Sequence, residues 1–398
     1  MSLKKANHFN EKKIVFCSRT CKKNLHETYD GEYGSITKEV KTNTRKNPYN
    51  YDFILIVSDD RKTTSLKEQY DEFILDADAL KEATKGFINM YKTGYITNTA
   101  RNLFATFCKI EPESIESYET EYFNNTGAGL RIGESYTGSA YKYDFKSFYP
   151  SIYYSLNIMF PIAKGTLKTI TQETFDNYQY IPYGVYRAKI TTKLKYFWDN
   201  PNYYYSHYEL TYARELGLTI EILGDCIVWD RSQLKTGKEI FYKYTKYLYD
   251  LKEKKVRGAK TLLNVIWGSL CKTTDYKYVH DCTKNGIYDI KENMNVKELV
   301  FLNDDFTKFE VHYNRPKHFF DTPWARIKPF LIGKARVIMG KTIQPYADSI
   351  VFCHTDSMIS KIKLPVKTGD KIGNLSYEGY CSDAVILNKA KRSGKYVV

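Results

Sequence analysis

The sequence has no hydrophobic run long enough to cross a membrane. No window approaches the ~18 uncharged apolar residues that a spanning helix needs. The N-terminal segment, MSLKKANHFNEKK, also lacks the apolar core of a secretory signal peptide. We therefore expect an intracellular, cytoplasmic protein.

Internal repeats and long low-complexity segments are absent as well. At 398 residues, the chain is large enough for two or more subdomains. Its eight cysteines are expected to be reduced thiols. Cys17 and Cys21 lie near His8 and His26; their spacing matches no strong zinc template, and a zinc site there stays open as an alternative.

Basic residues outnumber acidic ones. There are 60 Lys and Arg against 46 Asp and Glu, which gives a formal charge of +14 and a pI near 9.1. This excess favours a polyanionic partner, most commonly nucleic acid. The 37 tyrosines and 21 phenylalanines bring the aromatic fraction to 16% and place stacking faces beside basic charges. The alternative is a coding bias toward Tyr, Lys and Asn, which gives the same excess without a function.

Hydrophobic periodicity places the main elements. The first ~60 residues are polar and Lys-rich, and they are typical of poorly packed surface structure. Near the end of this region the pattern predicts a short buried strand over 51–59. After it, the pattern predicts helix over 68–107, strands over 184–197, a helix over 207–218, a strand over 219–223, and helices over 238–255 and 259–272.

The stretch 143-YDFKSFYPS-151 places one carboxylate among aromatic residues. Tyr141, Tyr143 and Phe145 alternate with Lys142 and Asp144, as on a strand with one packed face. Pro150 fits a turn followed by the start of a helix. Asp144 is therefore expected at the end of a strand, beside a turn.

Two further stretches carry polar residues in a pattern. On the helix over 259–272, Lys260, Asn264, Trp267 and Gly268 share one face, and leucines and Ile266 line the other. The segment 348-DSIVFCHTDSMISKIK-363 is typical of two strands joined by a tight turn, which places Asp356 at a hairpin tip.

In order, DFKSFYPS, K-x-x-x-N-x-x-W-G and HTDS resemble motifs A, B and C of family B DNA polymerases, especially the protein-primed branch of phages and linear plasmids. TGAGLRIG resembles the linker signature upstream of motif A. RIKPFLIGKARVIMG resembles the helix that carries a family arginine, here Arg336. The segment 373–396 resembles the one that ends in the family's K-x-Y motif, and the resemblance covers about residues 105–398.

The resemblance implies a metal-dependent site. Asp144, Asp356 and the backbone carbonyl of Phe145 would hold two Mg²⁺ ions, with Mn²⁺ as an alternative, and the two aspartates would be catalytic. Phosphoryl transfer of this kind depends mostly on positioning and charge stabilisation. The alternative for the two aspartates is an ordinary surface position at a strand end.

The resemblance also implies binding residues. Nucleotide contacts would come from Tyr149 as a steric gate against ribose, and from Lys260, Asn264 and Lys252. The alternatives are a core tyrosine and solvated helix residues. DNA contacts would come from Gly127, Ala128 and Gly129 near the template, and from Lys395 and Tyr396 at the primer end. The alternatives there are a flexible loop and a basic tail.

Several positions depart from the family pattern. His354 stands where motif C has its first aspartate, and Trp267 and Val265 replace a tyrosine and a serine of motif B. Lys395 and Tyr396 lack the spacer of K-x-Y. Asp30 and Glu32 formally match an exonuclease D-x-E, and Asp76 resembles the last exonuclease motif faintly, so we expect no proofreading. A complete exonuclease and a thumb are not expected in this chain.

We predict an α+β fold in which an antiparallel palm sheet carries a helical-hairpin fingers region. The expected segments are: an N-terminal region over 1–105 that is a candidate exonuclease remnant, palm with motif A over 106–165, palm and a first insertion over 166–230, fingers with motif B over 231–275, a second insertion over 276–325, and palm with motif C and the Lys-Tyr pair over 326–398.

The expected function is template-directed DNA synthesis in viral, phage or plasmid replication. The partners would be primer-template DNA, dNTPs and, where priming is by a protein, a terminal protein that binds the insertions. Two alternatives stay open at this point. The first is a catalytically silent polymerase-like protein that binds DNA or a replication partner. The second is an RNA-synthesising or reverse-transcribing enzyme, although such transcriptases have two adjacent carboxylates at this hairpin.

Overall fold

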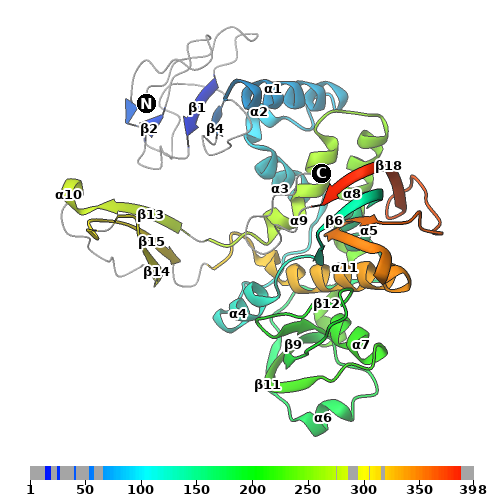
Figure 1. Cartoon of the computed structure of the whole chain (residues 1–398). Coiled ribbons are helices and arrows are strands. Elements are labelled where there is room, and N and C mark those ends of the chain that lie inside the picture. The colour runs from blue at the N-terminus through cyan, green and yellow to red at the C-terminus, as the bar shows by residue number, and fades with distance from the viewer. Residues whose placement is uncertain are drawn as a thin grey trace. The chain divides into compact units, whose positions relative to one another are not determined.

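The fold was obtained as a computed structural model (Figure 1). It describes residues 66–274, 276–285, 295–303, 305–314 and 319–386, together with the backbone of four short strands before residue 66. The chain divides into two compact units. The first consists of Met1–Lys109 and Lys243–Ser269, and the second of Ile110–Tyr242 and Leu270–Val398.

The first unit is mostly helical where its side chains are described. Its strands β1 and β4 pair in parallel, and β2 and β3 pair antiparallel. Its elements are β1 (Ile14–Ser18), β2 (Leu25–His26), β3 (Val40–Lys41), β4 (Phe53–Val57), α1 (Leu66–Ala83), α2 (Met90–Thr93), α3 (Ile96–Phe107), α9 (Ala259–Leu270) up to Ser269, and the part of α8 (Gly237–Glu253) from Lys243 onward.

The helical region predicted over 68–107 consists of three helices rather than one. After α1, Lys85 and Gly86 both have left-handed φ angles, of 50° and 82°, so the helix cannot continue. Asn89 then caps α2, with its side chain accepting a hydrogen bond from the Tyr91 amide, and Gly94 ends α2 with a φ of 83°. Local turn chemistry therefore overrides the apolar periodicity.

Helix α9 has the two faces that the sequence predicts. Leu262, Leu263 and Ile266 are buried, whereas Lys260 and Asn264 are exposed. The buried face packs within the first unit, where the hydroxyl of Tyr244 on α8 donates a 2.6 Å hydrogen bond to the Leu262 carbonyl.

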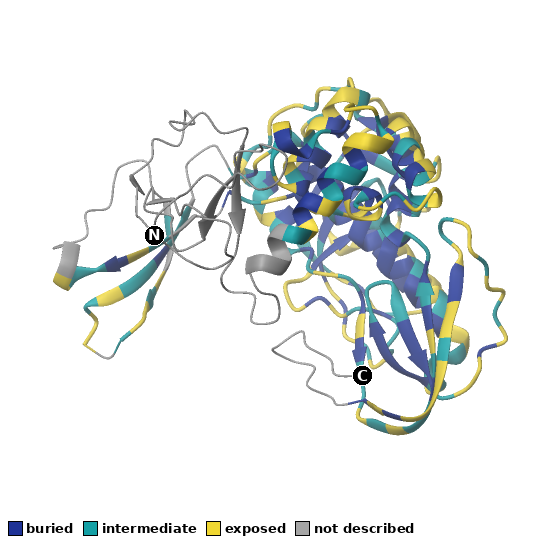
Figure 2. Ribbon diagram, turned by 90° about the horizontal axis from the view of Figure 1, so that it is seen from above, coloured by how far each residue is buried: buried dark blue, intermediate teal, exposed yellow. Residues whose placement is uncertain are grey.

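The second unit combines helices with antiparallel sheets, and Figure 2 shows buried positions running through its strands and helices. Its elements are α4 (Ser117–Asn125), β5 (Arg131–Gly133), β6 (Tyr136–Phe145), α5 (Phe148–Tyr153), β7 (Met159–Pro161), β8 (Thr166–Thr169), α6 (Gln172–Asp176), β9 (Gly184–Lys189), β10 (Tyr204–Ser206), α7 (His207–Glu215), β11 (Glu221–Val228), η2 (Arg231–Gln233), β12 (Leu234–Thr236), the start of α8, β13 (Tyr276–Asp281), α10 (Cys282–Asn285), β14 (Asn295–Phe301), β15 (Lys308–Asn314), η3 (Pro323–Arg326), α11 (Ile327–Ile343), η4 (Gln344–Ser349), β16 (Ile350–His354), β17 (Ser357–Ser360) and β18 (Leu375–Ile386).

A five-stranded sheet in the order β18-β6-β17-β16-β5 forms the centre of this unit. Every neighbouring pair in it is antiparallel. Strand β6 lies between β18 and β17, so the last residues of β6 have a partner strand on each side. The segments that resemble motifs A and C therefore belong to one sheet.

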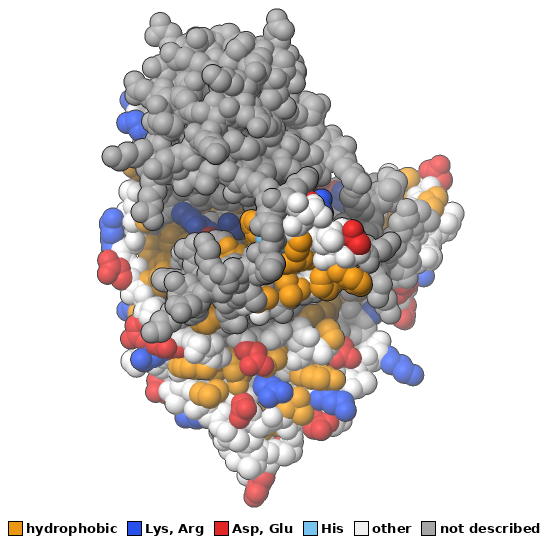
Figure 3. All heavy atoms as spheres, turned by 90° about the vertical axis from the view of Figure 1, so that its left-hand side faces the viewer, with side chains coloured by type: hydrophobic (Ala, Val, Ile, Leu, Met, Phe, Trp, Pro, Cys, Tyr) orange, Lys and Arg blue, Asp and Glu red, His pale blue; other side chains and the backbone are white. Residues whose placement is uncertain are grey.

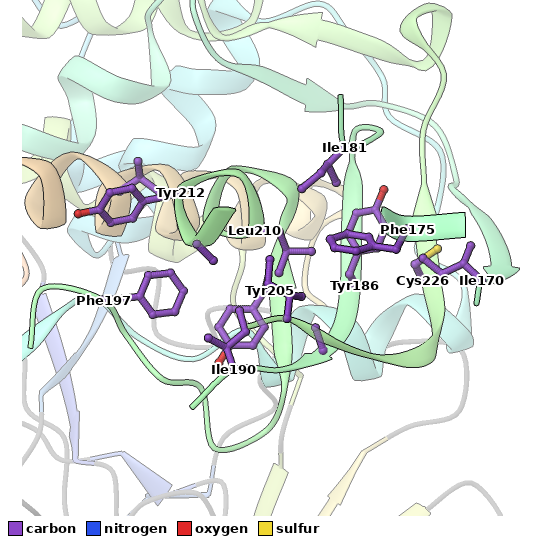
Figure 4. Close-up of a cluster of buried hydrophobic side chains, with 14 residues drawn as sticks. Ile170, Phe175, Ile181, Tyr186, Ile190, Phe197, Tyr205, Leu210, Tyr212 and Cys226 are labelled. Carbon is purple, nitrogen blue, oxygen red and sulfur yellow. The ribbon is translucent and has the colours of Figure 1, made fainter. Parts of the chain in front are cut away.

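A second sheet, in the order β10-β9-β11-β8, packs against α7 through a cluster of buried rings and aliphatic side chains (Figure 4). The strands predicted over 184–197 are shorter than expected, because β9 ends at Lys189. Beyond it, the Thr192 hydroxyl accepts a hydrogen bond from the Leu194 amide, which is a local turn that competes with strand pairing.

The stretch over 276–325 contains a third sheet, in the order β13-β15-β14. Helix α11 is buried along most of its length and packs on α5 and α7. In the described part of the chain, no helix is long and apolar enough to cross a membrane. The six described cysteines are free thiols, as the sequence predicts for them.

Charged side chains of both signs lie among hydrophobic ones over the lower part of the face shown in Figure 3. The net positive charge of the chain is therefore not gathered into one patch at that place.

Candidate active site

The ends of β6 and of the β16–β17 hairpin bring Asp144 and Asp356 side by side. Asp144 lies opposite Ser357 of β17, and the Phe145 amide donates a 2.9 Å hydrogen bond to the Asp356 carbonyl. Residues that are far apart in sequence thus become neighbours through ordinary antiparallel pairing. Both carboxylates are half-buried.

The tip of the hairpin is a tight two-residue turn, as the sequence predicts. Thr355 has a φ of 65°, and the Asp356 amide donates a 2.8 Å hydrogen bond to the His354 carbonyl. The Thr355 amide donates a 2.9 Å bond to the Leu130 carbonyl, just before β5. The turn is therefore held on both sides, which fixes the backbone at Asp356.

The electrostatics of the site are those of crowded negative charges. Burial raises the pKa of Asp144 from 3.8 to about 6, and the charges of Asp356 and Glu378 act in the same direction. Lys142 and Lys146 oppose this shift but do not cancel it. The site therefore holds negative charge that nearby lysines neutralise only in part.

Glu378 is a residue of this site that the motif comparison missed. It lies at a bulge of β18, where the register against β6 shifts between Tyr377 and Gly379. Its carboxylate pairs with Lys146 at 2.9 Å, and this hydrogen bond lowers the pKa of Glu378. The signal in the sequence is the glycine inside LSYEGY, since a glycine within a strand often marks a bulge.

Tyr149 lies on α5, the short helix that follows β6. The prediction that the helix starts after Pro150 is wrong, because α5 begins at Phe148. Ser147 is left-handed, with a φ of 49°, and Pro150 sits in the first turn, where its missing amide is not needed. Burial raises the pKa of Tyr149, and the negative charge of Asp356 contributes to the same shift.

The loop with Gly127, Ala128 and Gly129 packs on the hairpin tip. A Cβ atom at Gly129 would lie 3.1 Å from the Thr355 hydroxyl, and one at Gly127, whose φ is 72°, would lie 2.1 Å from the Trp198 ring. Glycines at these places therefore allow close backbone packing. This packing role does not depend on a contact with template DNA, which stays a prediction.

The Arg336 side chain supports this glycine loop through hydrogen bonds. It is buried, and its guanidinium donates to the Ala128 carbonyl at 2.7 Å and to the Thr126 carbonyl. It also pairs with the buried Glu209 at 2.6 Å, and it lies 3.5 Å from the centre of the Trp198 ring. Arg336 is therefore a buried support for the loop rather than an exposed cation.

The other predicted site residues belong to other parts of the sequence. Lys260 and Asn264 are exposed on α9, and Lys252 lies at the end of α8 with its ammonium 5.1 Å from the centre of the Tyr249 ring. All three belong to the first unit. Lys395, Tyr396, Asp30 and the cysteine and histidine group near Cys17 lie outside the residues whose side chains are described.

The donor set at Asp144 and Asp356 fits a hard divalent cation. Over the described residues, no group of three or more His, Cys, Asp or Glu side chains could hold a metal ion. Mg²⁺ is usually bound by one or two carboxylates together with substrate phosphates, so a pair of carboxylates is a sufficient protein contribution. The charges of Asp356 and Glu378 contribute to the raised pKa of Asp144, and a bound cation would oppose this repulsion.

Comparison with solved structures shows the type of fold. Phi29 DNA polymerase complexed with single-stranded DNA matches with a TM-score of 0.52 at 14% identity, over 80% of this chain and 59% of that chain. Its complex with primer-template DNA matches with a TM-score of 0.51 at 14% identity, and its ternary complex with primer-template DNA and incoming nucleotide with 0.50 at 13%, over the same shares of both chains. The chain has a polymerase-like fold.

The matched part spans 59% of the phi29 polymerase chain, so the likeness covers only part of that protein. No protein-family model and no curated protein sequence matches this chain. At this level of identity the likeness concerns the fold, and the roles of single residues stay predictions.

The charge crowding at Asp144 predicts a gain in stability when that charge is removed. A carboxyl group with a higher pKa in the folded state binds its proton preferentially there, so its contribution to stability falls as the pH rises from about 4 to about 6. In a buffer with a chelator, Asp144→Asn should be more stable than wild type at pH 8, by about 1 kcal/mol after allowance for solvent screening. The difference should vanish near pH 4.

Denaturant unfolding of both proteins at the two pH values measures this effect. Asp176→Asn, on the exposed face of α6, removes one negative charge from the same unit and serves as the control. A variant of Asp144 that is less stable than wild type at pH 8 would contradict the electrostatic account of the site.

Proposed function

We propose that the chain is a template-directed DNA polymerase of the family B, protein-primed type. In this proposal the five-stranded sheet is the palm and the α8–α9 hairpin is the fingers. The observation that carries it is the pairing of β6 with β17, which places the aspartates of motifs A and C together in a sheet of polymerase-like fold. The ordered motifs and the basic, tyrosine-rich composition support the same reading.

The reaction is the attack of a primer 3′-oxygen on the α-phosphorus of a dNTP. The new bond joins that oxygen to phosphorus, the bond to pyrophosphate breaks, and the hydroxyl proton is lost. Asp144, Asp356 and the Phe145 carbonyl would hold two Mg²⁺ ions, or Mn²⁺. When bound, these ions supply activation of the attacking oxygen and stabilisation of the leaving group. The protein's part is to hold both carboxylates in fixed positions at the ends of paired strands inside the sheet.

We assign substrate binding to residues near these strand ends and on α9. Tyr149, at the start of α5, would lie under the sugar and exclude a 2′-hydroxyl. Lys260 and Asn264 would contact the triphosphate from the exposed face of α9, with Lys252 as a further candidate. Primer-template DNA is the proposed partner, which the DNA complexes of phi29 polymerase support. A terminal protein is the proposed partner where priming is by a protein.

His354 supports a second candidate function. It replaces the first aspartate of motif C and lies at the end of β16, opposite Arg131 of β5 and Ser357 of β17. A histidine side chain carries no negative charge, so its presence in place of a carboxylate lowers the negative charge beside Asp356. The alternative is therefore a catalytically silent protein that keeps the fold and binds DNA or a replication partner.

Primer extension with Mg²⁺ and dNTPs separates the two functions. The wild-type chain should extend a primer, and Asp144→Asn and Asp356→Asn should each lower the rate by about 100-fold or more, since several kcal/mol of charge stabilisation are removed. Asp176→Asn should extend at the wild-type rate. Extension by Asp144→Asn at the wild-type rate would refute the catalytic assignment, and DNA binding without extension by wild type would support the silent alternative.

Cation binding can be measured without catalysis. Mn²⁺ titration followed by electron paramagnetic resonance should show that wild type binds the ion in the absence of DNA, and that Asp144→Asn and Asp356→Asn bind it at least about tenfold more weakly. The reason is that each variant removes one of two charged oxygen ligands. Equal binding by wild type and both variants would place the ion elsewhere.

The assignment of Tyr149 predicts a change in sugar selection. Tyr149→Ala should incorporate rNTPs more readily than wild type, by about tenfold or more relative to dNTPs, because a steric clash is removed. Phe148→Leu, which alters the neighbouring buried ring, should leave the ratio unchanged. Competing dNTP and rNTP incorporation at one template position measures it, and an unchanged ratio in Tyr149→Ala would remove the steric-gate role.

A further inference from the structure

Helix α1 contacts the loop between α8 and α9 directly. The Arg257 guanidinium in this loop donates from Nε to Asp76 Oδ1 on α1 at 2.6 Å. The Asp76 side chain is 15% exposed, so its carboxylate depends on this partner for most of its neutralisation. All of these residues belong to the first unit.

The backbone of the loop lies against the same face of α1. Gly258 has a φ of 79°, and a Cβ atom there would lie 2.9 Å from Leu80 Cδ1 and 3.3 Å from Asp76 Cβ. Asp76 and Leu80 are one helical turn apart, so they present one surface to the loop. A larger residue than glycine at 258 would therefore push the loop away from α1.

This contact lies next to the first turn of α9. The Gly258 carbonyl accepts the hydrogen bond of the Leu262 amide at 2.9 Å, which begins the helix, and Lys260 is the second residue of α9. The position of the loop therefore sets the position of the first turn of α9, which carries Lys260. The opposite end of α9 is also anchored, because Arg101 on α3 donates to the Ser269 hydroxyl and carbonyl, each at 2.5 Å.

Asp76 is the acidic residue whose segment faintly resembles the last exonuclease motif. Its ion pair with Arg257 indicates a structural role instead. Burial raises the pKa of Asp76, and the contact with Arg257 opposes this shift. We propose that Asp76 and Arg257 form a brace by which α1 positions the first turn of α9, and with it the triphosphate contact of Lys260. This inference rests on the proposed function for the role of Lys260.

Hydrogen exchange tests the brace without any need for activity. In the full chain, Asp76→Ala and Arg257→Ala should each speed amide exchange over 254–262 by about 2- to 5-fold, the range expected for loss of a partly exposed ion pair. The double variant should exchange no faster than the faster single variant, because both remove the same contact. Gly258→Ala should also speed exchange over 254–262, because the added methyl group would clash with α1. If Asp76→Ala does not fold, Asp76→Asn replaces it in the experiment.

The matched control is Asp78→Ala. Asp78 lies on the same helix, but its carboxylate accepts a 2.6 Å hydrogen bond from the Tyr91 hydroxyl on α2. This control should leave exchange over 254–262 unchanged. Wild-type exchange in both single variants of the brace, or an equal effect of the control, would overturn the proposal.

Steady-state kinetics then test the link to nucleotide binding. The single variants should raise KM for dNTP by about 2- to 5-fold with little change in kcat, because the chemical groups are untouched. Faster exchange with an unchanged KM would show a brace that does not position the nucleotide contact, and would overturn that part of the proposal. If wild type does not extend primers, the proposed function fails, while the exchange result still decides whether the brace exists.

Discussion

The antiparallel pairing of β6 with β17 is the constraint on which the candidate site depends. One hydrogen bond, from the Phe145 amide to the Asp356 carbonyl, joins the end of a strand to the tip of a hairpin. This pairing forces two acidic side chains into one place, although each alone would be better solvated apart. The ends of interior strands are well suited to hold such a pair, because hydrogen bonds to a strand on each side fix the backbone there.

The neighbouring elements act to keep this arrangement in place. The glycine loop contacts the hairpin tip at Thr355, Arg336 holds the loop by its carbonyls, and Glu209 on α7 pairs with Arg336. Arg336 thus joins α11, α7 and the loop through one buried cation. The ion pair is fully partnered, which is the condition under which a buried arginine is tolerated. The support is built from groups whose loss would leave unpaired charge.

The sequence predicted the parts of the site that follow from strand period and motif order. Alternation in YKYDF placed Asp144 on a strand, and the apolar runs around HTDS placed Asp356 at a hairpin tip. It could not predict the bulge that brings Glu378 close, nor the position of α5, which depends on a left-handed serine before the helix. It also gave one helical region where the chain forms three, because turn chemistry at Lys85, Gly86 and Asn89 outweighs periodicity.

The departure at motif C is easier to understand from the charges of the site than from the motif alone. Burial, together with the charges of Asp356 and Glu378, already raises the pKa of Asp144 to about 6. A third carboxylate at position 354 would add to this repulsion, whereas His354 does not. Arg131, opposite His354, adds positive charge on the same side. Under the proposed function, the two carboxylates would bind divalent ions more weakly than a site with a third carboxylate, but with less charge repulsion in the folded state.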